Sequence, residues 1–130
     1  VDPSRKDVML VSELVGGVQL DEFVEHAGPL QTRDQFCILS DVCCALWYLH
    51  KQQPPIVHGD VKPANIIVEK PGIVPRAKVI DFGLSTVVAR SERSRGGTLV
   101  WAAPEVLRGL QYKPRPSADV FSFGFVVHFV

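Results

Sequence analysis

The longest stretch of regularly spaced apolar residues predicts a helix over residues 33–51. Apolar side chains recur in it at intervals of three and four, which is the spacing of one helix face. Thr32 lies just before this stretch and Gln35 follows three residues later, an arrangement typical of a capping box. Pro54 and Pro55 end the helix. The buried face predicted by the spacing consists of Phe36, Leu39, Cys43, Leu46 and Leu49.

Shorter apolar runs predict strands on both sides of this helix. Residues 8–14 have the composition of a buried strand, and Gly16 and Gly17 end it with a flexible turn. Because helices and short strands alternate along the chain, it should form one mixed domain with a core of its own. The other strands are predicted at residues 56–57, 66–68 and 78–80.

Two more helices follow from start signals. Asp21 is a candidate N-cap for a short helix over residues 22–26. Ser117 is a candidate N-cap for a helix over residues 118–130, which is apolar on nearly all sides. A helix of that kind is expected at the buried centre of a domain, so we predict a central position for it.

Composition narrows the class of protein only a little. The 130 residues are 46% hydrophobic and 22% charged, as in ordinary globular proteins. Fourteen basic and fourteen acidic residues balance, so charge favours neither a nucleic acid partner nor an anionic membrane. No apolar run approaches the roughly 20 residues of a membrane-spanning helix. The three cysteines show no metal-binding spacing, which favours reduced thiols and a cytoplasmic location.

One short loop concentrates chemically useful side chains. Asp60, Lys62 and Asn65 provide a proton acceptor, a positive charge and an oxygen that can bind a metal. Pro63 prevents a regular helix through the middle of the loop. Taken alone, these residues are also typical of a solvated turn. The motifs further along the chain are needed to choose between a solvated turn and a catalytic loop.

The order of those motifs resembles the eukaryotic-type protein kinase family. Each motif alone is a weak signal, but the ordered set with fitting gaps is a strong one. The resemblance covers residues 8–130 and implies an α+β, protein kinase-like fold, with a mainly helical lobe and short β-hairpins around the catalytic loop. The motifs are Asp60-x-Lys62-x-x-Asn65, Asp81-Phe82-Gly83, Gly97-Thr98, Ala103-Pro104-Glu105 and Ser117-x-Asp119.

This resemblance implies ATP-dependent phosphoryl transfer to serine or threonine hydroxyls of protein substrates. By resemblance, Asp60 orients the acceptor hydroxyl and takes its proton, while Lys62 steadies the transferring phosphate. Thr98 resembles the threonine that hydrogen-bonds both of these side chains. Asn65 and Asp81 resemble the residues that hold the Mg²⁺ ions on the ATP phosphates.

The resemblance also implies an adenine site. Ser12 resembles the gatekeeper, Glu13 and Val15 resemble hinge residues whose backbone meets the base, and Ile67 resembles the apolar floor beneath it. Asp119 resembles a helix carboxylate that anchors the catalytic loop. The complete implied set of nucleotide-binding residues is Ser12, Glu13, Val15, Lys62, Asn65, Ile67 and Asp81, while His58 and Phe82 resemble stacked members of the regulatory spine.

Two departures from the family pattern shape our expectations. Gly59 stands where most kinases carry an arginine that receives a phosphorylated loop, so activity should depend little on phosphorylation at Ser91, Ser94 or Thr98. The chain shows no Gly-rich loop and no Val-Ala-Ile-Lys strand. We therefore expect a partial catalytic domain that is inactive in isolation and lacks the N-lobe and the last C-lobe helices. Residues 1–20 would end the N-lobe and form the hinge, and residues 21–130 would form the C-lobe through its central helix, left poorly covered.

Two other functions fit the same residues less well. A pseudokinase or scaffold would bind protein partners without catalysis, but the retained Asp60, Lys62, Asn65 and Asp81 argue against it. A small-molecule phosphotransferase of similar fold is disfavoured because Ala103-Pro104-Glu105 resembles the platform on which protein kinases bind protein substrates.

Overall fold

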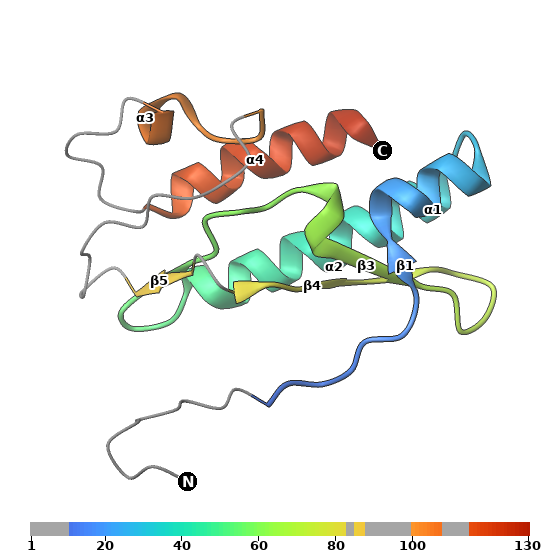
Figure 1. Cartoon of the computed structure of the whole chain (residues 1–130), viewed down its shortest axis with the longest axis horizontal. Coiled ribbons are helices and arrows are strands. Elements are labelled where there is room, and N and C mark those ends of the chain that lie inside the picture. Colours follow the sequence, from blue (N-terminus) through green and yellow to red (C-terminus); the bar gives the residue numbers. More distant parts are fainter. Residues whose placement is uncertain (1–10, 83–84, 88–99, 108–114) are drawn as a thin grey trace, which may run out of the picture.

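A computed structural model describes residues 11–82, 85–87, 100–107 and 115–130, which form a small antiparallel sheet against a helical layer (Figure 1). Helix α2 packs on strand β4 with one side and contacts helix α4 with another. The helices are α1 (Leu20–Ala27), α2 (Thr32–His50), α3 (Pro104–Leu107) and α4 (Pro116–Phe129), with one 3₁₀ turn, η1 (Pro63–Asn65). The strands are β1 (Val18–Gln19), β2 (Ile56–Val57), β3 (Ile66–Glu69), β4 (Arg76–Val79) and β5 (Thr86–Val87).

Strand β3 is the centre of a three-stranded sheet. It pairs antiparallel with β1 on one side and with β4 on the other. Ile66 and Val68 of β3 are buried in the core, while Ile67 and Glu69 lie on the opposite face. A separate antiparallel pair joins β2 to β5. Helices and antiparallel strands thus combine as the α+β prediction requires.

The buried face of α2 differs from the predicted one. Asp34, Ile38, Val42 and Leu46 are buried, at intervals of four residues. Phe36 is 72% exposed and Cys43 is exposed, so their predicted burial was wrong. The cause is that apolar residues surround much of this helix, and spacing alone does not decide which stripe meets the sheet. The core joins Leu20, Ile38, Val42, Leu46, Val61, Ile66, Val68 and Val126, with Leu39 packed against it.

The predicted helix caps were also wrong. Helix α2 begins at Thr32 with Gln31 as its N-cap, and no side chain caps it. The Gln35 amide instead donates to the carbonyl oxygen of Val130 at 2.8 Å, a contact 95 residues away in sequence. Asp21 lies inside the first turn of α1 and accepts the Glu22 N–H at 3.0 Å. Local spacing does not reveal such long-range partners.

The strand predicted at residues 8–14 does not form in its described part. Val11 and Leu14 are 78% and 95% exposed, and residues 8–10 lie outside the described residues. Pairing with β3 starts only at Val18, after Gly17 turns the backbone with a φ of 113°. An apolar run needs a neighbouring strand edge to become a strand, and the described residues give this one no such partner.

Helix α4 is buried on one side only, contrary to the central position predicted for it. Ala118, Asp119, Ser122 and Val126 are buried, whereas Phe121 is 38% exposed. The Trp101 ring contacts two of its phenylalanines, Phe125 and Phe129, and the poor coverage expected from the sequence stays a prediction. Among the described helices, none has both the length and the apolarity needed to cross a membrane. The other exposed apolar side chains of α4 are Val120, Phe125, Val127 and Phe129.

Candidate active site

The loop from His58 to Asn65 begins at the end of β2 and ends in η1, just ahead of β3 (Figure 1). His58 and Val61 are buried, with 0% and 1% of their surface exposed. Pro63 starts the 3₁₀ turn, and the Asn65 N–H donates to the Lys62 carbonyl oxygen at 2.9 Å to close it. His58, Val61 and Pro63 thus hold the loop on the core, and Asn65 is buried as well, at 6% exposed.

The structure brings together the three loop residues predicted from the sequence. The Lys62 ammonium lies 2.7 Å from Oδ2 of Asp60. The Asn65 amide nitrogen donates to the same oxygen at 2.9 Å and to the Asp60 backbone carbonyl at 2.8 Å. The Asp60 side chain is 9% exposed, so these bonds are largely shielded from water. They fix the direction of the carboxylate relative to the amine.

Asn65 and Asp81 are the predicted magnesium ligands, and the end of β4 lies beside Asn65. The Ile80 N–H donates to the Asn65 carbonyl oxygen at 2.9 Å, and Asp81 follows with a φ of 62°. Because the Asn65 amide nitrogen points at two acceptors of Asp60, its side-chain oxygen points away from them. An amide oxygen and a carboxylate are donors that Mg²⁺ prefers, with phosphate and water completing the shell.

No larger acidic site replaces this pair. Within the described residues, no three His, Cys, Asp or Glu side chains cluster in a way that could hold a metal ion by themselves. Thr98, the third predicted catalytic residue, lies outside the described residues.

Asp119 of α4 holds the start of the loop from behind. Its Oδ2 accepts the His58 N–H at 2.8 Å, and its Oδ1 accepts the Gly59 N–H at 2.9 Å. The anchoring contact implied by the family resemblance is therefore present. Oδ2 also accepts a hydrogen bond from Nε2 of His50 at 2.8 Å. Asp119 is 1% exposed, so all three bonds are buried or nearly so.

Sequence reasoning missed His50. It lies at the end of α2, eight positions before His58, and nothing in the local spacing marks it. Its partner Asp119 is 69 residues away. The sequence places His50 shortly before the predicted loop and Asp119 within a later motif. Neither position predicts that the two side chains meet.

His58 has a single protonation pattern that satisfies both of its ring nitrogens. Nε2 lies 3.1 Å from the Ile80 carbonyl oxygen, which only accepts, so Nε2 carries the proton. Nδ1 accepts the Asp60 N–H at 3.3 Å. The His58 ring thus links the residue after β4 to the loop that carries Asp60. The Phe82 ring lies 5.2 Å away and is tilted by 57°, so the two rings touch without stacking in parallel.

Gly59 occupies a backbone position that favours glycine. Its φ is 81°, in the left-handed region that side chains with a Cβ rarely adopt. The substitution that distinguishes this loop from the usual family pattern is therefore matched to its backbone geometry.

Of the residues predicted to meet adenine, Ile67 lies on the face of the sheet that points away from the core. Ser12 and Glu13 are exposed and Val15 is half-buried. The Glu13 carboxylate lies 2.7 Å from the ammonium of Lys78, which is the cross-strand neighbour of Ile67. The structure thus brings the Glu13 side chain towards the strand pair that carries Ile67.

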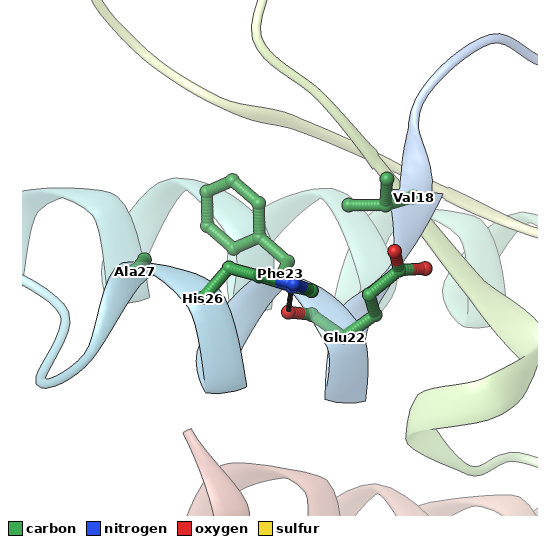
Figure 2. Close-up of a pocket in the computed structure, with 5 residues that line it drawn as sticks. All are labelled: Val18, Glu22, Phe23, His26 and Ala27. Atoms are coloured by element: carbon green, nitrogen blue, oxygen red, sulfur yellow. Dashed lines mark hydrogen bonds between the residues drawn. The ribbon is translucent and has the colours of Figure 1, made fainter.

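A cavity of about 440 Å³ lies on α1 beside β1, apart from these residues (Figure 2). Figure 2 shows that its side chains come from α1 and from β1. Nδ1 of His26 lies 2.8 Å from the Glu22 carbonyl oxygen. None of the predicted catalytic or nucleotide-binding residues lines it. The lining residues are Val18, Glu22, Phe23, His26 and Ala27.

Comparison with known proteins agrees with the motifs. Residues 3–130 match the family described as "Protein kinase domain". Sperm motility kinase 3A of Mus musculus is 38% identical over 129 residues, 98% of this chain and 24% of that protein. Serine/threonine-protein kinase CTR1 of Arabidopsis thaliana is 37% identical over 127 residues, 93% of this chain and 15% of that protein. The chain thus spans a quarter or less of these relatives, and it belongs to the protein kinase family.

Proposed function

We propose that these residues form the catalytic loop of an ATP-dependent kinase that phosphorylates serine or threonine side chains of proteins. The observation that carries the proposal is the Asp60 carboxylate, held by Lys62 at 2.7 Å and by Asn65 at 2.9 Å. The activity is proposed for the whole protein that carries this sequence.

In this proposal Asp60 acts as the proton acceptor for the substrate hydroxyl. Its carboxylate is pre-oriented, so the hydroxyl meets a fixed acceptor and little reorganisation is needed. Lys62 lies beside it and places one positive charge where negative charge moves between phosphate oxygens. Bound Mg-ATP would supply the phosphoryl group and the metal, held by Asn65 and Asp81.

The choice of serine or threonine over tyrosine rests on the loop sequence. Lys62 followed by Pro63 resembles the loop of kinases directed at serine and threonine. CTR1, one of the relatives, is named as a serine/threonine-protein kinase. We therefore propose a protein with an accessible serine or threonine as the substrate.

The test is phosphoryl transfer from radiolabelled Mg-ATP to two peptide libraries, one with serine and threonine acceptors and one with tyrosine. Asp60→Asn should lower the rate by about 10²- to 10⁴-fold, the usual contribution of a general base. Glu25→Gln, a carboxylate-to-amide change at an exposed position of α1, should leave the rate unchanged.

Three outcomes would contradict parts of the proposal. Equal labelling of the tyrosine library would reject the assigned substrate class. ATP binding without transfer by the unaltered protein would favour the pseudokinase or scaffold function instead. A full rate in Asp60→Asn would remove Asp60 from the proposed role.

A further inference from the structure

Lys78 lies at the centre of a charge cluster that joins three separate segments. It belongs to β4 and faces Ile67 across the β3–β4 pairing. Its ammonium lies 2.7 Å from Glu13 and 3.5 Å from Glu69, the last residue of β3. Two carboxylates therefore share one ammonium on the face of the sheet that carries Ile67.

The segment ahead of β1 has few other attachments to the sheet. Val11 and Leu14 are mostly exposed, and the described residues of this segment form no strand before Val18. In the part of the chain that the structure describes, Glu13–Lys78 is the one ion pair that joins this segment to the sheet. Gly17 provides the second attachment, because its backbone passes close to Val68.

The two attachments together set where the segment runs. Gly17 fixes its end against β3, and Lys78 fixes its middle through Glu13. Gly16 lies between them, and a Cβ there would be 3.7 Å from Oε1 of Glu69. The backbone of this segment is thereby held at the same face as Ile67.

We propose that Lys78 is a positioning residue for the adenine of the nucleotide. It acts through Glu13, holding the backbone that meets the base at a set distance from the apolar floor at Ile67. This inference rests on the proposed function, because it assumes that adenine binds between these two elements.

A plain surface ion pair is the alternative. Exposed pairs often contribute nothing measurable, and the side chains of Lys78 and Glu13 are 38% and 69% exposed. The two possibilities differ in their effect on ligand affinity, since a pair without a positioning role leaves the affinity for adenine compounds unchanged.

The experiment titrates the protein with Mg-ATP and, separately, with adenosine. Lys78→Met should weaken both by about two- to fivefold, the range that one exposed ion pair supplies. Glu13→Gln should do the same, and the double variant should be no weaker than either single variant. Lys70→Met is the control, because Lys70 is an exposed lysine in the connection between β3 and β4. It should change neither affinity.

A second readout does not depend on nucleotide. The ¹⁵N heteronuclear NOE of residues 12–16 should fall in Lys78→Met and stay unchanged in Lys70→Met. Equal NOE values in both variants, or additive affinity losses in the double variant, would overturn the role of Lys78. A third outcome is that the unaltered protein binds neither ligand while the NOE still falls in Lys78→Met. Lys78 would then hold residues 12–16 in place, but the proposed adenine site would be rejected.

Discussion

The loop from His58 to Asn65, proposed as the catalytic loop, and the segment ahead of β1 are held in opposite ways. The loop has buried residues within it, two backbone N–H groups bonded to Asp119 and two side-chain donors on Asp60. Residues 11–17, the described part of the segment ahead of β1, are mostly exposed, and the described residues give them one ion pair and one close backbone approach. The loop is organised before any ligand arrives, whereas the segment has little that fixes it beyond Lys78 and Gly17.

This difference separates the expected effects of substitution. Changes behind the loop should cost stability, because they leave buried polar groups without partners. Changes to the exposed side chains of the segment should cost little stability and act mainly on nucleotide affinity. Gly17 is the exception, because its backbone lies against Val68. The substitutions that follow test this division, from the largest effect to the smallest.

Asp119→Ala should have the largest effect, lowering the free energy of unfolding by about 3–5 kcal/mol. It removes the acceptor of the His58 and Gly59 N–H groups and of His50. Chemical denaturation followed by tryptophan fluorescence measures it. Asp119→Asn retains one acceptor oxygen and should lose less, whereas Glu25→Ala on exposed α1 should stay within about 0.5 kcal/mol. Equal stability of Asp119→Ala and Glu25→Ala would show that the loop is not held from α4.

Gly17→Ala should lower the free energy of unfolding by about 3 kcal/mol, combining backbone strain with a clash. A Cβ there would lie 2.9 Å from the Val68 carbonyl carbon and nearer still to its oxygen. Gly28→Ala is the matched control, because Gly28 also has a positive φ of 67° but open space around it. If the two variants lose the same stability in denaturant, the close approach to Val68 contributes nothing.

Gly59→Ala should lower the free energy of unfolding by about 1–2 kcal/mol, because its φ of 81° disfavours a Cβ. Gly72→Ala, at an exposed position without a positive φ, should be neutral or slightly stabilising. Thermal unfolding of both variants gives the comparison. A neutral Gly59→Ala would mean that the loop accepts other residues at this position without strain.

The smallest effect concerns Lys78 and pH. Its hydrogen bond with Glu13 raises the pKa of Lys78 above the ordinary 10.5, outweighing its partial loss of solvent. A raised pKa means that the stabilisation is complete below about pH 10.5 and is lost as pH rises through the raised value. NMR titration of the Lys78 side chain should show this pKa return towards 10.5 in Glu13→Gln. An unchanged pKa of Lys78 in Glu13→Gln would mean that Lys78 does not interact with Glu13.

The sequence predicted the parts of the fold that depend on local signals. The long helix, the strands at residues 56–57 and 66–68 and the last helix were confirmed close to their predicted bounds. The predicted buried face of α2 was right at Leu46 and wrong at Phe36 and Cys43, because apolar residues surround the helix and spacing alone does not select the stripe that meets the sheet. The strand at residues 8–14 was wrong in its described part, because strand formation depends on a neighbour that spacing does not supply.

The candidate site was predictable where motif order carried the information. The structure brings Asp60, Lys62 and Asn65 together. Asp81 follows β4, directly after Ile80, whose N–H bonds to Asn65. His50 was missed because its bond to Asp119 spans 69 residues. The functional roles of all these residues stay predictions, which the proposed transfer and binding experiments address.

The bonds to Asp119 also bear on the order in which the chain folds. They join positions that are 60 and 61 residues apart in sequence. Forming them closes a long loop, and the chain loses conformational entropy before the new contacts stabilise it. The hydrogen bonds within helix α2 and those of the β3–β4 pairing join residues that are close in sequence and should form earlier. During synthesis from the N-terminus, the catalytic loop therefore reaches its final shape only after α4 has been made and has docked behind it.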